Sequence, residues 1–573
     1  MAQNESQART EKETKAQRVE RLKREKNPWM ALDEIRGFAR TGFDSIPPEW
    51  LGTYFRWWGV YTQGDGAGVV GGQGGEGKAL PCFMLRIRIP NGILNSPQLR
   101  TVAELTQRHA RGIADLTVRQ NIQLHWITIE ALPEILEALW QCGLNTIGAC
   151  GDVTRNITGC PVAGVDAEEI CDASPLALAA TQMLAGNSDF YNLPRKFKIS
   201  ITGCRVWCAY PEINDIGLTA VTRTLNGKPE TGFSLRVGGG LSAEPHLAAR
   251  LNAFVRWNQV DLVIKGIAEL FRESSQLREH RERARLKFLF LRHGWTAEDF
   301  QKELEQRIGF HLDAAAPEDA PADVYRDHIG IHAQKQSGYC YVGAAVLRGR
   351  ITAEQMRMAA DLADRFANGE LRTTNMQNLL TINVPRLQAE SLAKQLDAIG
   401  LRVGGSPFWR GAVACSGTEF CKLAITETKS FSRWLVEELE ERLPGFEQHL
   451  KLHVTGCPNS CGQHWIADIG IEGKKLKVGE RLLDAYYFCL GGGVGLHQSI
   501  ARPVGYRCLA SEVPDAIERL LRRYLIDRLS NENLRHFFAR HSDAELRSFL
   551  AGEVIEAVPR DLSPGRVPHG VEG

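Results

Sequence analysis

An internal repeat constrains the fold of this chain more than any other feature of its sequence. Residues 201–217 read ITGCRVWCAYPEINDIG, and residues 454–470, which lie 253 positions later, read VTGCPNSCGQHWIADIG. The two segments share both of their cysteines and a closing Asp-Ile-Gly. The same offset carries the glycine run 238–240 onto 491–493. We therefore predict two homologous halves related by a pseudo-two-fold axis.

A weaker echo lies upstream, where LTVRQNIQL (116–124) resembles RTTNMQNLL (372–380). Within each half, strand-like runs alternate with amphipathic helical ones, such as FMLRIRIP at 83–90 and QLRTVAELTQRHA at 98–110. This alternation is typical of a mixed architecture rather than an all-helical or all-strand one. The predicted fold class is α+β (mixed α/β) with an internal duplication.

Composition excludes several classes of protein. At 573 residues, with 43% hydrophobic and 24% charged residues, the chain can form several buried cores. Lys and Arg (69) nearly cancel Asp and Glu (68), which argues against a nucleic-acid-binding protein. No run approaches 18 apolar residues, and the charged N-terminus has no apolar signal core, so we expect no membrane span and a cytoplasmic location.

Four segments are expected to carry no chemistry. Residues 5–27 are predicted to form a solvated charged helix or arm, and the glycine-rich stretch 64–78 a flexible loop. The Ala/Pro/Asp-rich segment 311–326 is interpreted as a linker. Residues 511–552 are predicted to form amphipathic helices that pack on the core.

The cysteines of the second half form a metal-ligand pattern. Cys415 and Cys421 make a C-x5-C pair, and Cys457 and Cys461 make a C-x3-C pair about 35 residues later. Four thiolates from two loops suit either tetrahedral zinc or a [4Fe-4S] cluster. Because a five-residue spacing is unusual for zinc, the pattern favours the iron–sulfur cluster, with structural zinc and chance as alternatives.

The first half does not repeat this pattern at the same offset. Val162 and Glu168 stand where Cys415 and Cys421 would be expected. A second four-thiol set is conceivable, with ten residues between its first two cysteines: Cys160, Cys171, Cys204 and Cys208. Ordinary helix-forming residues fill that spacing, so we interpret these cysteines as packed free thiols and expect one cluster only.

Five cations of the first half stand beside predicted strands: Arg86, Arg119, Arg155, Lys196 and Lys198. Each alone is most simply a solvated charge at a sheet edge. On a strand, however, Lys196 and Lys198 would point to the same face. Cations that converge repel one another unless an anion compensates. Such a pocket would bind a polyanionic cofactor and a small oxyanion substrate, and it would stabilise charge during reduction.

Several motifs together resemble one enzyme family. They are the C-x5-C pair with TGCPNSCG, and the segments MLRIRIPNG, TVRQNIQLHW, TRNITGCPVAGVD and NLPRKFK. The combination is similar to the sirohaem-containing assimilatory nitrite/sulfite reductases over residues 30–510. This resemblance implies two ferredoxin-like halves that pair into one domain, plus two related α/β domains around a central cofactor site.

On this basis the chain divides into five segments. We expect an N-terminal arm with the glycine-rich loop at 1–78, the ferredoxin-like halves at 79–148 and 329–400, the first α/β domain at 149–328, and the second, with the cluster cysteines and C-terminal helices, at 401–573.

The resemblance also implies roles for individual residues. The cluster ligands would be Cys415, Cys421, Cys457 and Cys461, with Cys461 also bridging to the sirohaem iron. The substrate anion would be bound by Arg86, Arg155, Lys196 and Lys198. The carboxylates of sirohaem would be contacted by Arg119, Gln123 and His125. The implied reaction is a six-electron reduction of sulfite to sulfide or nitrite to ammonium.

The resemblance also implies a monomer. The glycine runs do not follow the strand–G-x-G-x-x-G–helix pattern of a dinucleotide site, so no flavin or nicotinamide module is expected. Electrons would then come from a separate donor, most simply ferredoxin. A basic docking surface such as the Lys474, Lys475 and Lys477 run is conceivable, but a run of this kind is usually a solvated face.

Two positions bear on which oxyanion is reduced. Nitrite enzymes of this family commonly have Asn where this chain has Lys198, and Ser-Gly-Met-Asp where it has the segment with Cys150. Sulfite is mostly dianionic near neutral pH and nitrite carries one charge, so the extra cation favours sulfite. We predict sulfite as substrate, with nitrite as the alternative. Tyr61 is a further pocket candidate, and ordinary packing is the simpler interpretation of Cys150 and Tyr61.

Overall fold

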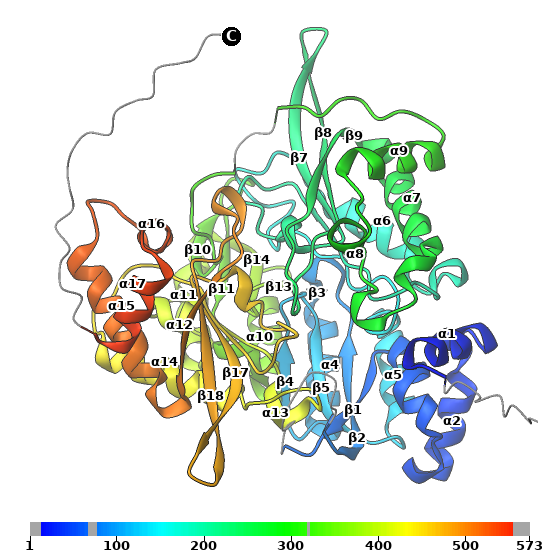
Figure 1. Ribbon diagram of the computed structural model, residues 1–573, viewed down its shortest axis with the longest axis horizontal. Helices are drawn as coiled ribbons and strands as arrows, with labels where there is room; N and C mark the ends of the chain where they lie inside the picture. Colours follow the sequence, from blue (N-terminus) through cyan, green and yellow to red (C-terminus); the bar gives the residue numbers. More distant parts are fainter. Residues whose placement is uncertain (1–12, 67–76, 318–320, 554–573) are drawn as a thin grey trace, which may run out of the picture.

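The computed structural model describes residues 13–66, 77–317 and 321–553 (Figure 1). Parts of three predicted segments lie outside these ranges: most of the glycine-rich loop, the first residues of the charged arm and three residues of the linker. Four β-sheets organise the rest, and helices cover them. The mixed α/β class predicted from the sequence is confirmed.

Two five-stranded sheets form the ferredoxin-like pair. The first runs in the order β1 (Val60–Gly64), β2 (Ala79–Ile87), β5 (Ile122–Ile127), β4 (Ile113–Leu116) and β12 (Arg350–Thr352). The second runs β10 (Gly330–Ala333), β11 (Tyr339–Ala344), β14 (Leu379–Pro385), β13 (Glu370–Thr373) and β3 (Ile93–Asn95). Their helices are α4 (Ser96–His109), α5 (Leu132–Gln141), α10 (Ala353–Phe366) and α11 (Ala389–Ala398).

The two halves exchange their edge strands. Strand β12 of the second half pairs antiparallel with β4 of the first, and β3 of the first half pairs with β13 of the second. Helices α4 and α10 pack against each other, and one hydrophobic core contains buried residues of both halves. The predicted pairing of two ferredoxin-like halves into one domain is therefore confirmed.

The structure aligns segments 116–124 and 372–380 one residue differently from the comparison of their sequences. Gln120 and Gln377 occupy matching places, both with positive φ (57° and 62°). The Gln120 side-chain amide donates to the Thr373 carbonyl at 3.1 Å, and that of Gln377 donates to the Leu116 carbonyl at 2.9 Å. Each glutamine thus bonds the other half, and the true offset here is 257 rather than 256 residues because Gln120 aligns with Gln377.

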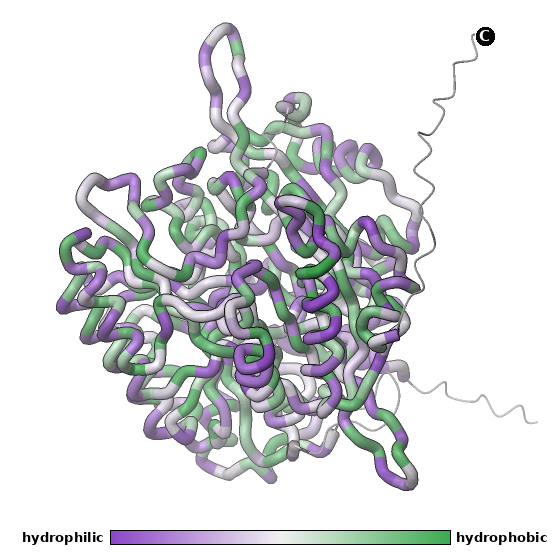
Figure 2. Tube along the Cα trace, turned by 90° about the vertical axis from the view of Figure 1, so that its left-hand side faces the viewer, coloured by the Kyte–Doolittle hydropathy of each residue, from purple (hydrophilic) through white to green (hydrophobic). Residues whose placement is uncertain are grey.

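Two further sheets form the related α/β domains. The first contains β6 (Ile199–Thr202), β7 (Ile216–Leu225), β8 (Lys228–Val237) and β9 (Ala249–Arg256). The second contains β15 (Ala412–Ala414), β16 (Leu452–Thr455), β17 (Ile469–Val478), β18 (Arg481–Leu490) and β19 (Arg502–Leu509). Strands β6 and β7 pair in parallel, as do β16 and β17, before each chain turns back in a long hairpin. The hairpins β7–β8 and β17–β18 project at opposite ends of the molecule (Figures 1 and 2).

Helices cover both α/β sheets. They are α6 (Ser174–Leu184), α7 (Val260–Glu273) and α9 (Ala297–Ile308) in the first domain, and α14 (Lys429–Arg442), α15 (Val513–Asp527), α16 (Leu534–Arg540) and α17 (Asp543–Ala551) in the second. The last three confirm the helices predicted at the C-terminus, since their apolar residues belong to the core of the second domain.

The charged helix at the N-terminus differs from its prediction. Helix α1 (Lys15–Glu25) exposes most of its charges, but Lys23 is fully buried. The Lys23 ammonium donates to the Leu193 carbonyl at 3.0 Å and lies 3.6 Å from the Asp152 carboxylate. The helix therefore docks on the first α/β domain, because the buried ammonium is paired and hydrogen-bonded there.

Candidate functional site: a cysteine set beside a group of cations

The four cysteines of the second half leave one edge of its sheet. Strands β15 and β16 are parallel, with Ala414 opposite Val454, so their carboxyl ends meet. Cys415 follows β15 directly, and Cys421 ends the short helix α13 (Gly417–Phe420). Cys457 and Cys461 follow β16.

Local backbone geometry presents these thiols. Ser460 and Gln463 adopt positive φ (54° and 60°) on either side of Cys461, so the chain turns tightly there. The Gly456 amide donates to Cys415 Sγ at 3.2 Å, and the Asn459 side-chain amide donates to Cys457 Sγ at 3.5 Å. Such bonds stabilise thiolates, which are the form that ligates metal.

The four cysteines lie close enough together for the charge of one thiolate to raise the pKa of another. Burial, and then the charges of Cys461 and Cys415, raise the pKa of Cys421 to about 12. The pKa of Cys457 is raised by burial and then by Cys461, Cys415 and Cys421.

Arg86, on β2, begins the neighbouring group of cations. Its Nε donates to Gln123 Oε1 on β5 at 2.8 Å, and a terminal nitrogen lies 3.5 Å from Cys150 Sγ. The guanidinium also lies over the Tyr61 ring, 5.7 Å from its centroid. Burial acts to lower the pKa of Arg86, but Cys150, Tyr61 and Cys461 outweigh it and raise that pKa.

Lys196 and Lys198 enter the same recess from the segment before β6. Within the described chain, neither ammonium group has a carboxylate within 4.0 Å, and both side chains are half-buried. Burial lowers the pKa of Lys196 to about 7, helped by the charges of Arg285 and Arg195. Burial also lowers the pKa of Lys198 well below its usual value, followed by the charges of Arg119, Arg285 and Lys196.

Arg155 and Arg119 complete the predicted cations. Arg155 donates to the Gly151 carbonyl at 2.9 Å and 3.1 Å, which fixes its guanidinium beside the loop of Cys150. Arg119 donates to Asn214 Oδ1 at 2.8 Å and to the Asn156 carbonyl at 2.5 Å. Burial, and then Arg155, lower the pKa of Arg119 to about 9. The buried Nε of Arg119 has no hydrogen-bond partner among the described residues.

The sequence analysis missed the residues that hold this group in place. Asp215 is fully buried and accepts the Lys198 backbone N–H at 2.7 Å. It also forms a bidentate pair with Arg285, at 3.1 Å and 2.8 Å. The repeated Asp-Ile-Gly was the available signal for Asp215, because its counterpart Asp468 accepts the Lys451 N–H at the same 2.7 Å. Nothing in the sequence singled out Arg285.

His125 packs against helix α13. Its ring is fully buried and stacks on Phe420 of α13, with centroids 3.6 Å apart. The His125 Nε2 lies 2.8 Å from Asp115 Oδ2, and that carboxylate also binds Arg350. Gln123, two residues earlier on the same strand face, does reach the recess through Arg86. In this structure His125 therefore supports the helix that leads to Cys421.

Cys461 connects the two groups. It is exposed, whereas Cys457 is buried and the other two cysteines of the set are half-buried. Its charge acts on the pKa of Cys415 and Cys421 on one side, and on those of Arg86 and Lys196 on the other. The cysteine set and the cations are therefore parts of one site.

The donors of this site fit both expected groups. Four thiols on two loops match the ligand set of a [4Fe-4S] cluster. The unpartnered Arg119 Nε and the two lysines without a carboxylate partner match a carboxylate-rich macrocycle, since converging cations need compensating anions.

The structure also corrects the comparison of the two halves. The parallel bridge between Thr158 and Ser200 corresponds to the pair Val413–His453 of the second sheet. Two residues further along each chain, Cys160 takes the place of Cys415, so Val162 was the wrong counterpart. Asp166, in turn, takes the place of Cys421. Matching residues in this segment are 255 positions apart, whereas those of the main repeat are 253 apart. Because of this two-residue difference, a comparison at one constant offset does not find the match.

Comparison with known families agrees with this geometry. The family model described as the nitrite and sulphite reductase 4Fe-4S domain matches residues 150–312 and 405–555. The model described as the nitrite/sulfite reductase ferredoxin-like half domain matches residues 78–141 and 332–399. Together they cover more than half of the chain. The chain belongs to the nitrite and sulfite reductase family, whose members are oxidoreductases with an iron–sulfur cluster.

Individual relatives carry both substrate names. The chain is 37% identical over 536 residues to an assimilatory ferredoxin-dependent nitrite reductase of Haloferax mediterranei, covering 88% of each chain. It is 35% identical over 541 residues to a sulfite reductase [ferredoxin] of Mycobacterium tuberculosis, covering 92% of this chain and 95% of that one. The solved structure of Mycobacterium tuberculosis NirA protein superposes with a TM-score of 0.86 at 33% identity, over 92% and 97% of the two chains.

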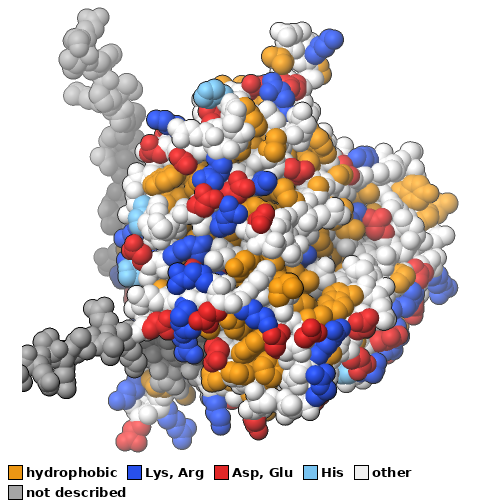
Figure 3. All heavy atoms as spheres, turned by 90° about the vertical axis from the view of Figure 1, so that its right-hand side faces the viewer, with side chains coloured by type: hydrophobic (Ala, Val, Ile, Leu, Met, Phe, Trp, Pro, Cys, Tyr) orange, Lys and Arg blue, Asp and Glu red, His pale blue; other side chains and the backbone are white. Residues whose placement is uncertain are grey.

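No helix among the described residues combines the length and apolarity needed to cross a bilayer. On the face shown in Figure 3, Lys and Arg side chains are interspersed with Asp and Glu. In the Lys474 run, Lys474 pairs with Glu472 at 2.5 Å and Lys475 pairs with Asp484, so two of its charges are compensated.

Proposed function

We propose that this enzyme reduces sulfite to sulfide with six electrons, at a sirohaem coupled to a [4Fe-4S] cluster. The observation that carries the proposal is the position of Cys461, which is close enough both to the other cysteines of the set and to Arg86 and Lys196 for its charge to act on their pKa values. A thiolate shared in this way would join a cluster to a second cofactor beside the cations. When bound, sirohaem supplies an iron that takes up the oxyanion and accepts electrons one at a time.

The cations would bind the oxygens of the anion and supply protons. Arg86 and Arg155 are fixed by hydrogen bonds to Gln123 and Gly151, so they orient the anion without reorganising. Lys196 and Lys198 carry ammonium groups whose pKa values are lowered by burial. A lysine with a pKa near 7 is well matched to give up a proton during turnover and to recover it from solvent.

Lys198 is the residue that favours sulfite. At about 4 Å and an effective dielectric constant near 20, each added pair of unit charges is worth roughly 4 kcal/mol before desolvation. About 1.4 kcal/mol corresponds to a tenfold preference for one substrate. About a third of the interaction energy with Lys198 is therefore enough to give a tenfold preference for sulfite. Sulfite, as a dianion, gains more from the extra ammonium group than nitrite does.

Nitrite is the second candidate, because the relatives named as nitrite reductases are as similar to this chain as those named as sulfite reductases. The discriminating measurement is kcat/KM for sulfite and nitrite in parallel, on protein loaded with both cofactors. A clear sulfite advantage would support the proposal. A clear nitrite advantage would overturn the argument from Lys198 and assign the enzyme to nitrite reduction.

Ferredoxin is the proposed electron donor, since the relatives in both branches carry it in their names. The enzyme is further proposed to act as a cytoplasmic monomer. Absorption spectra before and after addition of reduced ferredoxin test the donor and the cofactors together. Soret and red bands that change on reduction are expected. A protein purified with iron but without these bands would contradict the sirohaem assignment.

A further inference from the structure

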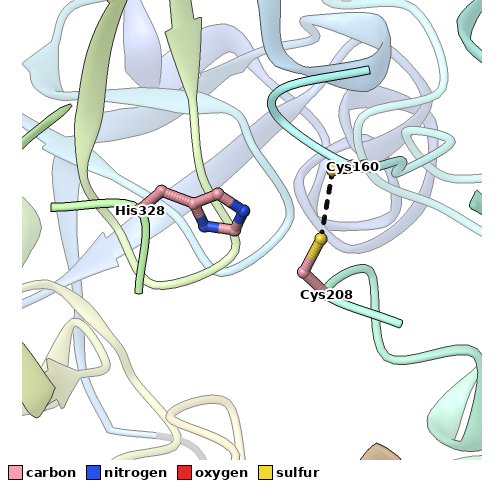
Figure 4. A group of neighbouring side chains, drawn as sticks. All are labelled: Cys160, Cys208 and His328. Carbon is pink, nitrogen blue, oxygen red and sulfur yellow. Dashed lines mark hydrogen bonds between the residues drawn. The ribbon is translucent and has the colours of Figure 1, made fainter. Parts of the chain in front are cut away.

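The first half contains a second cluster of metal-binding side chains. Cys160 Sγ lies 3.2 Å from Cys208 Sγ, and Cys204 Sγ lies 3.0 Å from Cys208 Sγ. The His328 ring approaches them from the segment before β10 (Figure 4). Ligand atoms of Cys160, Cys208 and His328 all lie within 4.8 Å of one another. Cys171, the fourth thiol considered from the sequence, lies near Gly203 and not in this cluster.

His328 brings a buried imidazole nitrogen without a hydrogen-bond partner in the described chain to this cluster. The side chain is 4% exposed, and its Nε2 makes no hydrogen bond within the described chain. A buried polar atom without a partner costs about 1–3 kcal/mol, so its retention needs an explanation.

The surroundings suit an ion held by thiolates. Thr202 Oγ1 lies 3.1 Å from Cys204 Sγ, and the Cys208 backbone N–H donates to that sulfur at 3.4 Å. Arg326 is close enough to both Cys160 and Cys208 to feel their charges, and Arg372 is close enough to Cys160. Two buried nitrogens of Arg372 have no hydrogen-bond partner among the described residues. These cations would offset the excess negative charge of three thiolates around a divalent ion.

The structure also shows why this place would not hold an iron–sulfur cube. Asp166 stands where the second half has Cys421, and it is committed to a bidentate pair with Arg326 at 2.6 Å and 2.8 Å. Cys208 Sγ lies 3.2 Å from Cys160 Sγ and 3.0 Å from Cys204 Sγ, and all three cysteines are buried. Cys160, Cys208 and His328 lie at the spacing of ligands to a single ion, and Cys204, which lies beside Cys208 but outside that group of three, would be the fourth ligand of a tetrahedral site. A cavity lined by Cys208, Tyr210 and Arg326 gives an ion a path inward.

We propose that Cys160, Cys204, Cys208 and His328 form a structural zinc site in the first half, at the position related by pseudo-symmetry to the iron–sulfur cluster. On binding, three thiols lose their protons to solvent and the neutral imidazole keeps its own, so no oxidant or reductant is needed. The site would fasten the segment before β10 to the first α/β domain.

The test measures zinc on the holoenzyme, independently of turnover. Elemental analysis after removal of loosely bound metal is expected to give about one zinc per chain. Zinc K-edge absorption should show sulfur at about 2.3 Å and nitrogen at about 2.0–2.1 Å, in a three-to-one ratio. Less than a tenth of an equivalent of zinc, oxygen-dominated ligation, or a disulfide among the three cysteines would overturn the proposal.

Variants localise the metal. In Cys160→Ser/Cys208→Ser and in His328→Ala, zinc content should fall at least tenfold while iron and sirohaem stay as in the parent. Cys489→Ser, which alters a buried cysteine outside the cluster, should leave zinc unchanged. Zinc retained by both cluster variants would contradict the site. If the variants do not fold, the absorption experiment on the parent protein still decides.

Discussion

The two α/β domains start from one scaffold and present two different cysteine sites. In the second, Cys461 is exposed and its charge acts on the pKa values of Arg86 and Lys196, whereas its counterpart Cys208 is 8% exposed and touches two other sulfurs. The positions of Cys415 and Cys421 carry Cys160 and Asp166 in the first half. One replaced thiol and the approach of His328 are enough to turn an open site for a large cofactor into a compact one. Duplication preserved the backbone, and the side chains set the chemistry.

The largest effect is expected from removing the shared thiol. In Cys461→Ala, we expect turnover of sulfite and nitrite to fall by more than about 100-fold, because losing a direct ligand should exceed the 10–100-fold cost of losing an outer partner. Iron content should fall and zinc content should not. Cys489→Ala is the matched control for loss of a thiol, with unchanged iron. Normal turnover in Cys461→Ala would remove Cys461 from the site.

A second comparison uses two lysines in equivalent places, Lys198 and Lys451, whose backbone N–H groups both donate to an aspartate at 2.7 Å. Lys198→Asn should lower kcat/KM for sulfite by about 10–100-fold, and that for nitrite by less, since loss of one charge–charge contact costs about 1.4–2.8 kcal/mol here. Lys451→Asn should leave the ratio of the two substrates unchanged. Equal losses on both anions in Lys198→Asn would refute its role in selection.

The third prediction concerns pH. The pKa of Lys196 is lowered to about 7, so its ammonium form, which binds the anion, is lost from the free protein as pH rises through that value. Carboxylates of a bound cofactor would stabilise the ammonium form of Lys196 and so raise the pH at which it is lost. We therefore expect kcat/KM for sulfite to decline on the alkaline side, beginning at or above pH 7. In Lys196→Arg the decline should shift to higher pH, because a guanidinium stays charged. An unchanged pH profile in that variant would contradict the assignment.

The smallest effect tests the symmetry itself. Gln120→Met and Gln377→Met each leave carbonyls of the opposite half without their donor, so each should lower the free energy of unfolding by about 1–3 kcal/mol. Gln388→Met, at an exposed position, should change it by less than about 0.5 kcal/mol. Thermal or denaturant unfolding measures all three. A large loss for one glutamine only would mean that the two halves do not share this interface equally.

The sequence was sufficient for the duplication and the fold class, because these depend on short repeated motifs; the roles of the four cluster cysteines and the main cations stay predictions. It failed where insertions or long-range contacts decide. The match of Cys160 to Cys415 was missed because this segment repeats after 255 residues, whereas the neighbouring segment repeats after 253. Arg285 was missed because its partner Asp215 lies 70 positions away. The role of His125 at the cofactor, which the resemblance implies, stays a prediction; the contact of its ring with Phe420 depends on tertiary packing that the sequence does not show.

The exchange of edge strands has a consequence for how the chain is made. Strand β4 ends at Leu116, but its neighbour β12 begins only at Arg350, so one edge of the first sheet stays unpaired while more than 200 further residues are synthesised. An open edge invites pairing with other chains, and long-range closure is slow. Newly made protein should therefore need chaperone protection until the second half emerges, and the first half expressed alone should aggregate.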